Sequence, residues 1–260
     1  MIPLNSYTLC TAQIVAHIAA VWWLFNQPSW SDVFCVFAVY FFTGCLGMSV
    51  TYHRLLTHKS FRTHVFFEYV GTILATVGLT GSSLSWTAAH RLHHKKADQT
   101  GDPHSPVKLG YARAQFFSMF SKINIYTSPV ISKSFHRWMH RQYFTINLLW
   151  GILLYVSGGL DWVLIFWLVP AAVLWNAGSF INTICHTPFL GYRRYSTPDR
   201  SVNNPVLGLF MWGEGWHNNH HRFQTRAKFG ERWWEFDISF LVIWLISIDN
   251  SSHSQRKNVS

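Results

Sequence analysis

Charged residues are scarce in this sequence. Asp, Glu, Lys and Arg make up 12% of its 260 residues, about half of the share in an ordinary globular protein. Acidic residues are the rarer kind, with 11 Asp and Glu against 21 Lys and Arg, and the net charge is +10. Aromatic residues reach 17%. This composition is not typical of a soluble domain.

Cysteine is scarce as well. The four cysteines, Cys10, Cys35, Cys45 and Cys185, lie in or beside apolar segments and have no paired spacing. They therefore indicate neither a disulfide framework nor a thiolate metal site. No Lys or Arg and no small-residue cleavage site accompany the first apolar segment, so we do not expect a removed signal peptide. Without internal repeats, we expect a single domain over residues 1–260.

Long apolar segments account for the missing charge. Four of them, near residues 7–25, 32–50, 144–158 and 161–182, approach the ~20 residues that a helix needs to cross ~30 Å of hydrocarbon. Gly158 and Gly159 suit a turn between the last two. The sequence therefore predicts an all-α integral membrane protein with four transmembrane helices in two hairpins.

The basic residues are sorted along the chain. Twelve of the 21 lie between residues 54 and 141, nine lie between 193 and 257, and none lies in 1–53 or 142–192. The positive-inside rule then places segments 52–142 and 183–260 in the cytoplasm, as a His-rich helical cap. We interpret the net charge as a signal of topology and of contact with a lipid bilayer, and nucleic acid is not an expected partner.

Two further apolar stretches need a separate interpretation. Residues 65–86 are long enough to cross, but a crossing would put the histidines before and after them on opposite sides of the membrane. Glu68 and several glycines also weaken that case. We predict a helix at the interface here, and another in the short stretch 236–248. Four crossings then bring every His-rich segment to the cytoplasmic face.

Nine histidines and Asn182 lie in four short stretches of the chain. His90, His93 and His94 have i, i+3, i+4 spacing, and so do His217, His220 and His221, so each triad lies on one side of a helix. Two more pairs stand at the expected ends of the second and fourth spans: His53 with His58, and Asn182 with His186.

Nine imidazoles are more than one metal ion can hold. A tetrahedral zinc site uses four ligands and an octahedral ion uses six at most, so the count favours two metal ions. Glu214 with His217 is the one E-x-x-H pair in the sequence, whereas a carboxylate-bridged di-iron bundle uses two such pairs, so we do not expect that type of site. We expect Asp98, Asp102 or Glu214 to accept hydrogen bonds from the ligand rings. The remaining histidines are expected to be packing or interfacial residues: His17, His64, His104, His136, His140 and His253.

The motifs "HRLLTH", "HRLHH" followed by "DQTGDPHSP", "NTICH" and "GEGWHNNHH" resemble, in this order, the histidine boxes of the membrane fatty acid desaturases. The likeness extends from Phe41 to about Trp234. It is to the stearoyl-type Δ9 branch, and the third box is closer to the bacterial and plastid enzymes.

The resemblance implies two non-haem iron ions, with O2 as co-substrate. The implied ligands are His53, His58, His90, His93, His94, His186, His217, His220 and His221, with Asn182 acting through a water molecule. The implied reaction removes two hydrogens from adjacent methylenes of a fatty acyl chain carried on a lipid, on CoA or on acyl carrier protein. No haem motif of a fused cytochrome is present, so the electron donor is expected to be a separate protein. A ferredoxin is the expected donor, drawn to basic residues such as Lys95 and Lys96.

Other functions are compatible with parts of this pattern. A related di-iron hydroxylase or acetylenase would have the same histidine spacing. A metal transporter is a more remote alternative, because its ligands would lie near the midplane of the membrane. Phe41 and Cys45 are expected to close the methyl end of a substrate tunnel, although ordinary packing would explain them equally well.

Overall fold

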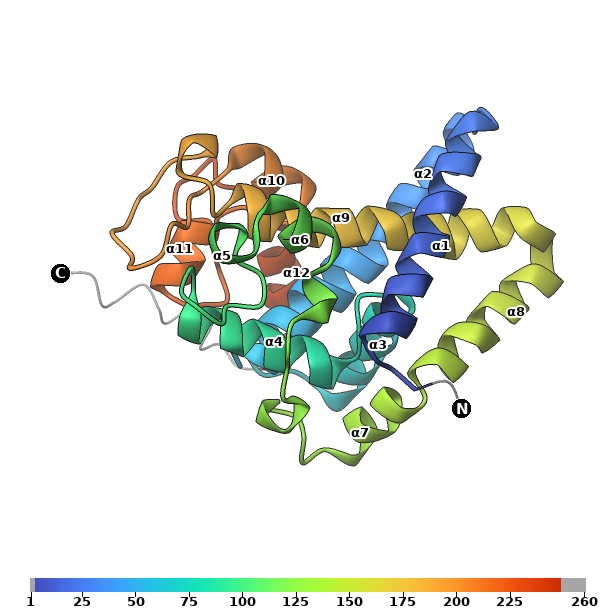
Figure 1. The fold of residues 1–260 in the computed structure, drawn as a ribbon, viewed down its shortest axis with the longest axis horizontal. Coiled ribbons are helices and arrows are strands. Elements are labelled where there is room, and N and C mark those ends of the chain that lie inside the picture. Colours follow the sequence, from blue (N-terminus) through green and yellow to red (C-terminus); the bar gives the residue numbers. More distant parts are fainter. Residues whose placement is uncertain (1–2, 249–260) are drawn as a thin grey trace.

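The computed structural model describes residues 3–248, and helices build most of it (Figure 1). The elements are α1 (Ser6–Phe25), α2 (Trp30–Tyr40), η1 (Phe41–Thr57), α3 (Val65–Val77), α4 (Ser83–Lys96), α5 (Pro106–Leu109), α6 (Tyr111–Phe116), η2 (Ser118–Phe120), η3 (Ile125–Thr127), α7 (Ser134–Arg141), α8 (Tyr143–Val163), η4 (Leu164–Leu168), α9 (Val169–Ile184), η5 (Pro188–Leu190), α10 (Pro205–Phe210), α11 (His217–Arg222) and α12 (Ile238–Ile246). Among these residues the β pairing is limited to three isolated bridges. His253 lies outside the described residues.

Three helical stretches in the described part of the chain are long and apolar enough to cross a membrane: Ser6–Phe25, Trp30–Thr57 and Tyr143–Ile184. The first begins at a capping box, in which the Asn5 side chain accepts from the backbone N–H of Thr8 and the Thr8 hydroxyl accepts from that of Asn5. The second continues to Thr57, seven residues beyond the predicted end at residue 50. The predicted helical class therefore agrees with the structure.

The third stretch contains a sharp corner. Gly158 and Gly159 both leave the helical conformation, and Gly159 has a φ of 67°, which a residue without a Cβ adopts readily. Figure 1 shows α8 and α9 leaving this corner in different directions. Helix α9 packs against α1 and α2, whereas α8 packs against α3. The break lies at the glycine pair where the sequence predicts a turn, and the two arms diverge from it.

The stretch 65–86 does not form one helix. It divides into α3, with 13 residues, and the first turn of α4. At 1.5 Å per residue α3 is about 20 Å long, which is short of ~30 Å of hydrocarbon. Helix α12 has nine residues and is shorter still.

The end of the second long helix is a π-helix, η1. Its bonds run from residue i to i+5, as in the bond from the His58 N–H to the His53 carbonyl at 3.1 Å. A π-helix has about 4.4 residues per turn. Residues five apart therefore lie on nearly the same face, and this geometry decides where the histidines of the first box point.

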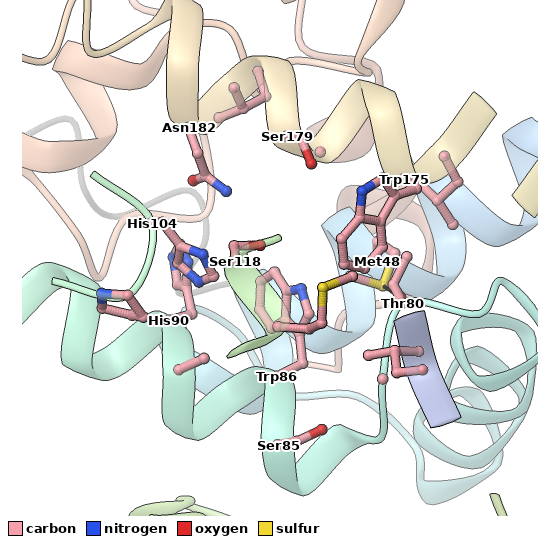
Figure 2. Close-up of a pocket in the computed structure, with 18 of the residues that line it drawn as sticks. Met48, Thr80, Ser85, Trp86, His90, His104, Ser118, Trp175, Ser179 and Asn182 are labelled. Carbon is pink, nitrogen blue, oxygen red and sulfur yellow. Dashed lines mark hydrogen bonds between the residues drawn. The ribbon is translucent and has the colours of Figure 1, made fainter. Parts of the chain in front are cut away.

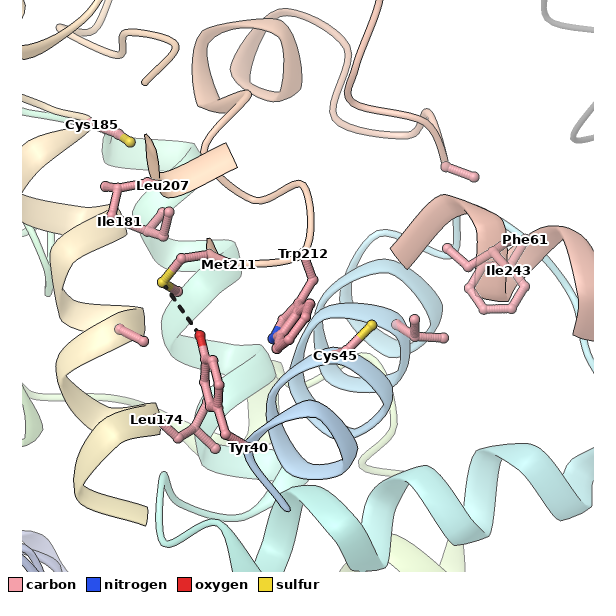
Figure 3. Packing of buried hydrophobic residues seen from close by; sticks show 13 residues of the cluster. Tyr40, Cys45, Phe61, Leu174, Ile181, Cys185, Leu207, Met211, Trp212 and Ile243 are labelled. Carbon is pink, nitrogen blue, oxygen red and sulfur yellow. Dashed lines mark hydrogen bonds between the residues drawn. The ribbon is translucent and has the colours of Figure 1, made fainter. Parts of the chain in front are cut away.

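The largest buried apolar cluster lies between η1, α9 and the chain after α10 (Figure 3). Tyr40, Leu174, Met211 and Trp212 meet in it, and the Tyr40 hydroxyl contacts Met211 Sδ at 3.7 Å. On the opposite side of η1, Cys45 and Ile243 tie α12 to the same cluster. This packing fixes the segment before α11, which carries the last histidine box.

Candidate metal centre

The structure brings the nine box histidines into two neighbouring groups. The five-histidine group consists of His53, His58, His90, His94 and His220, and the four-histidine group consists of His93, His186, His217 and His221. Within each group, one ring nitrogen from every member lies within 4.8 Å of those of the others. Both groups are therefore compact enough for a single metal ion each.

Each helical triad is divided between the two groups. In α4, His90 and His94 face the five-histidine group, and His93 faces the other. In α11 the arrangement is reversed, because His217 and His221 join the four-histidine group and His220 joins the five-histidine group. Helices α4 and α11 thus hold the two groups side by side.

The first box enters through the π-helix. His53 and His58 diverge on a straight α-helix, but the wider turn of η1 brings their ring centroids to 4.9 Å. His53 Nε2 lies 3.1 Å from His220 Nε2, and His220 Nε2 lies 3.0 Å from His94 Nε2. In the other group, His186 Nε2 and His217 Nε2 are 3.1 Å apart.

These separations fit metal coordination. Two imidazole nitrogens at right angles around an ion, each with a bond of about 2.1 Å, lie about 3.0 Å apart. Several ring nitrogens that face the groups are buried and have no hydrogen-bond partner, including Nε2 of His58, His93 and His221. A bound cation would satisfy them. An all-imidazole donor set suits iron, and five donors exceed the tetrahedral demand of structural zinc.

Carboxylates orient four of the imidazoles from behind. His93 Nδ1 donates to Asp102 at 2.9 Å, His186 Nδ1 to Asp98 at 2.8 Å, and His221 Nδ1 to Asp199 at 2.9 Å. In the five-histidine group His53 Nδ1 donates to Glu214. Each bond leaves Nε2 free to face the group, and it raises the basicity of the ring as a ligand. Asp199 was not anticipated from the sequence.

The electrostatics keep these groups in the forms that bind metal. Burial, the largest cause, lowers the pKa of His90, His94, His217 and His220 well below 6.5, so the rings are neutral. Burial alone would raise the pKa of the carboxyls, but the hydrogen bond from His186 lowers that of Asp98, and the bond from His221 lowers that of Asp199. Both stay ionised and accept the ring N–H.

Replacing Asp199 with asparagine should weaken metal binding. The variant keeps the shape of the side chain but loses the negative charge behind His221, so metal affinity should fall by roughly 10- to 100-fold. Competition with a chelator, followed by metal analysis of the purified protein, measures this change. Asp161→Asn is the matched control, because Asp161 lies beside the α8–α9 corner. Equal retention in the two variants would contradict the assignment.

A cavity of about 460 Å³ passes beside both groups. His53, His90 and His217 contribute to its wall, and so does Asn182, one turn before His186 (Figure 2). The rest of the wall is mainly apolar, with Trp86 and Trp175 prominent. Its size and lining are typical of a site for an apolar small molecule.

Phe41 and Cys45 do not line this cavity. The prediction that they close it is corrected by the π-helix, which turns their neighbours Tyr40 and Gly44 into it, followed by Met48. Cys45 Sγ instead lies 3.4 Å from Ser239 Oγ. Phe41 packs on Trp212 at 5.2 Å between ring centroids.

The other five described histidines lie outside the two groups. His17 bonds to Gln13 and Asn176, and His64 caps α3. His136 is fully buried between Ser83 and Glu68, so it is a packing residue. His104 and His140 line the cavity.

A sequence model of the fatty acid desaturase family matches residues 28–236 of this chain. The chain belongs to the fatty acid desaturase family. It is therefore a desaturase, an oxidoreductase, and the matched region contains every histidine of the two groups.

Named relatives share about a third of their residues with this desaturase. It is 31% identical to the sn-1 stearoyl-lipid 9-desaturase of Anabaena variabilis, over 89% of this chain and 87% of the relative. It is 32% identical to an acyl-CoA 5-desaturase of Anemone leveillei, over 84% and 70%. It is 31% identical to the Δ9 acyl-lipid desaturase 1 of Arabidopsis thaliana, over 91% and 80%. These relatives differ in acyl carrier and in double-bond position.

Proposed function

We propose that this desaturase uses two non-haem iron ions and O2 to insert a cis double bond at the Δ9 position of a saturated acyl chain carried on a membrane lipid. The cavity is the observation that carries the proposal. It joins an apolar compartment to the inner face of both histidine groups. An acyl chain lying in it would present two adjacent methylenes to the metal centre.

Iron in the two groups would supply the oxidising power, since no side chain can abstract hydrogen from an unactivated methylene. The overall balance is one O2, two electrons from a donor, two protons and two substrate hydrogens, giving two waters and one C=C bond. The protein's own residues hold the ligands, position the chain and keep bulk water out. Asp98, Asp102, Asp199 and Glu214 fix the direction of four imidazoles.

Position along the acyl chain must come from the shape of the cavity, because a methylene offers nothing to hydrogen-bond. Tyr40, the last residue of α2, and Gly44 of the π-helix lie on the cavity wall, 13 and 9 positions before His53. Trp212 and Met211 complete this apolar end. The distance from the polar end of the substrate to the metal centre then determines which carbons react.

The polar end supports a lipid as the carrier. Asn5 and Lys122 are exposed and also line the cavity, so it reaches the surface between the start of α1 and the segment after η2. A hydrogen bond from Ser6 Oγ to the Met119 carbonyl, at 2.7 Å, joins the two sides. The start of a membrane-crossing helix lies at the membrane interface, where lipid head groups are found.

The proposed topology has four crossings, with both histidine groups on the cytoplasmic side. The distribution of Lys and Arg supports it, and the glycine corner supplies the turn between the third and fourth crossings. A soluble ferredoxin would then reach the cytoplasmic face and supply the electrons. The excess of basic residues favours an acidic donor.

Product analysis tests the function directly. The protein is expressed in a host without its own desaturase and given saturated acyl chains, and the lipids are examined by gas chromatography and mass spectrometry. We expect a cis bond between C9 and C10 in lipid-bound chains. In membranes with added ferredoxin and its reductase, acyl lipid should react in preference to acyl-CoA or acyl carrier protein thioester. A hydroxylated or acetylenic product would contradict the proposed desaturation and indicate a hydroxylase or an acetylenase instead.

A further inference from the structure

Arg54 is a cation buried completely beside the metal centre. Its Nη1 donates to both oxygens of Asp237, at 2.9 and 3.0 Å, and to the Ala227 carbonyl at 2.7 Å. Its Nε and Nη2 donate to Glu214 Oε1 at 3.3 and 3.2 Å. Every nitrogen of the guanidinium is thus engaged. A buried ion cluster is often no more stable than apolar residues of the same volume, so stability alone does not explain Arg54.

One route from Arg54 to a ligand passes through Glu214. Glu214 Oε1 accepts hydrogen bonds from the Arg54 guanidinium and the Ser49 hydroxyl. The other oxygen, Oε2, accepts one from His53 Nδ1. Arg54 and Ser49 thereby fix the carboxylate that holds the His53 ring. The ring in turn points Nε2 at His220 Nε2, 3.1 Å away.

A second route passes through Phe229. The guanidinium carbon of Arg54 lies 3.8 Å from the centroid of this ring. Phe229 also stacks on His220, with the ring centroids 4.3 Å apart and an interplanar angle of 30°. The Phe229 backbone N–H donates to Asp237 Oδ2 at 2.7 Å, and that carboxylate is itself held by Arg54. Two ligands that face each other therefore both depend on one guanidinium.

The four-histidine group is supported in another way. Its carboxylates accept hydrogen bonds from nearby residues. Asp98 accepts from the Ser105 hydroxyl, Asp102 accepts from the backbone N–H of His104, and Asp199 accepts from the backbone N–H of Ser201. These supports come from residues near each carboxylate, and Asp98 also accepts from the Arg200 backbone N–H at 2.8 Å. None of these bonds involves Arg54. A change at Arg54 should therefore act on one group and spare the other.

We propose that Arg54 is a positioning residue that holds His53 and His220 in register for the metal ion of the five-histidine group. The inference rests on the proposed function, because it assumes one iron in each group. Metal occupancy of the five-histidine group then depends on Arg54, in addition to any contribution of Arg54 to folding. Lysine cannot replace it, since a single ammonium cannot span two carboxylates and stack on a ring.

The test is the iron content of purified Arg54→Lys protein. We expect iron to fall from two ions to about one per chain, while circular dichroism stays that of the wild type. The Mössbauer spectrum of ⁵⁷Fe-loaded protein should lose one component. The matched control is Arg226→Lys, because Arg226 also stacks on a ring, Phe223 at 3.5 Å, and pairs with a carboxylate, Glu231 at 2.9 Å. It should keep both ions.

Two more variants identify the site that is lost. His186→Ala removes a ligand of the four-histidine group, so Arg54→Lys combined with His186→Ala should hold almost no iron. If that double variant still holds one ion, Arg54 does not act on the five-histidine group, and the proposal is overturned. Phe229→Leu breaks only the ring route, and it should lower iron occupancy even if Arg54→Lys fails to fold. If Phe229→Leu keeps both iron ions and Arg54→Lys is unfolded, Arg54 has only a structural role, and the proposal is overturned.

These results separate the two proposals. A wild-type chain that holds two ions, beside an Arg54→Lys variant that also holds two, overturns the inference about Arg54 alone. A wild-type chain that holds no iron overturns the proposed di-iron function, and the assignment of Arg54 with it.

Discussion

Replacing His93 with alanine is expected to remove about one metal ion per chain and to abolish the desaturated product. His93 is fully buried, donates through Nδ1 to Asp102, and has no hydrogen-bond partner at Nε2. Its loss leaves three imidazoles in the four-histidine group. The loss of metal affinity should exceed about 100-fold, the upper range for removing only an outer partner of a ligand.

Metal analysis and lipid analysis of the same preparation measure this effect. His64→Asn is the matched control, because His64 is exposed and only caps α3, where asparagine is also a good cap. It should keep wild-type metal content and product. Retention of both metal and product in His93→Ala would show that the four-histidine group is not a metal site of the reaction.

Shortening Tyr40 to alanine should move the preferred substrate toward longer acyl chains. The Tyr40 ring lines the apolar end of the cavity, and its hydroxyl donates to the Phe210 carbonyl at 3.1 Å. Its removal opens a space that the neighbours fill only in part. The optimum should lengthen by roughly two to four methylenes, about the length of the lost ring. Competition among saturated chains of graded length measures the optimum.

Substitutions at two neighbouring residues are the controls for Tyr40→Ala: one should shorten the preferred chain length, and the other should leave it unchanged. A Cβ added at Gly44 would lie 3.0 Å from Tyr40 Cε2 and 3.2 Å from Trp212 Nε1, so Gly44→Ala narrows the same end and should favour shorter chains. Phe41→Ala, at a residue for which the sequence left tunnel closure and ordinary packing open, should leave the optimum unchanged. A larger shift in Phe41→Ala than in Tyr40→Ala would restore the prediction from the sequence.

Local chemistry explains what could be read from the sequence in advance. Apolar runs of membrane length and segregated basic residues are properties of single segments, so the helical class follows from them directly. The triads at 90–94 and 217–221 are likewise visible, because i, i+3, i+4 spacing places side chains together on any helix. The histidine boxes carry the family resemblance, and the family is confirmed by the match over residues 28–236.

Other features depend on contacts between distant segments. Asp199 lies in an ordinary loop sequence, and only the packing of that loop brings it to His221. Arg54 did leave a signal, since a charge at the end of an apolar span needs a partner. Its partners Glu214 and Asp237 stand 160 and 183 positions away, which no local pattern can indicate.

The sequence by itself determined the residue types of the site, because imidazole chemistry and helical spacing are local. The tertiary structure alone decided how the histidines are shared. Each triad is split between two groups, and the two histidines of the first box converge through a π-helix. Because of the same wider turn, the cavity wall contains Tyr40 and Gly44 and not the predicted Phe41 and Cys45. A change in residues per turn rotates every side chain that follows, and the packing of η1 against its neighbours is what maintains it.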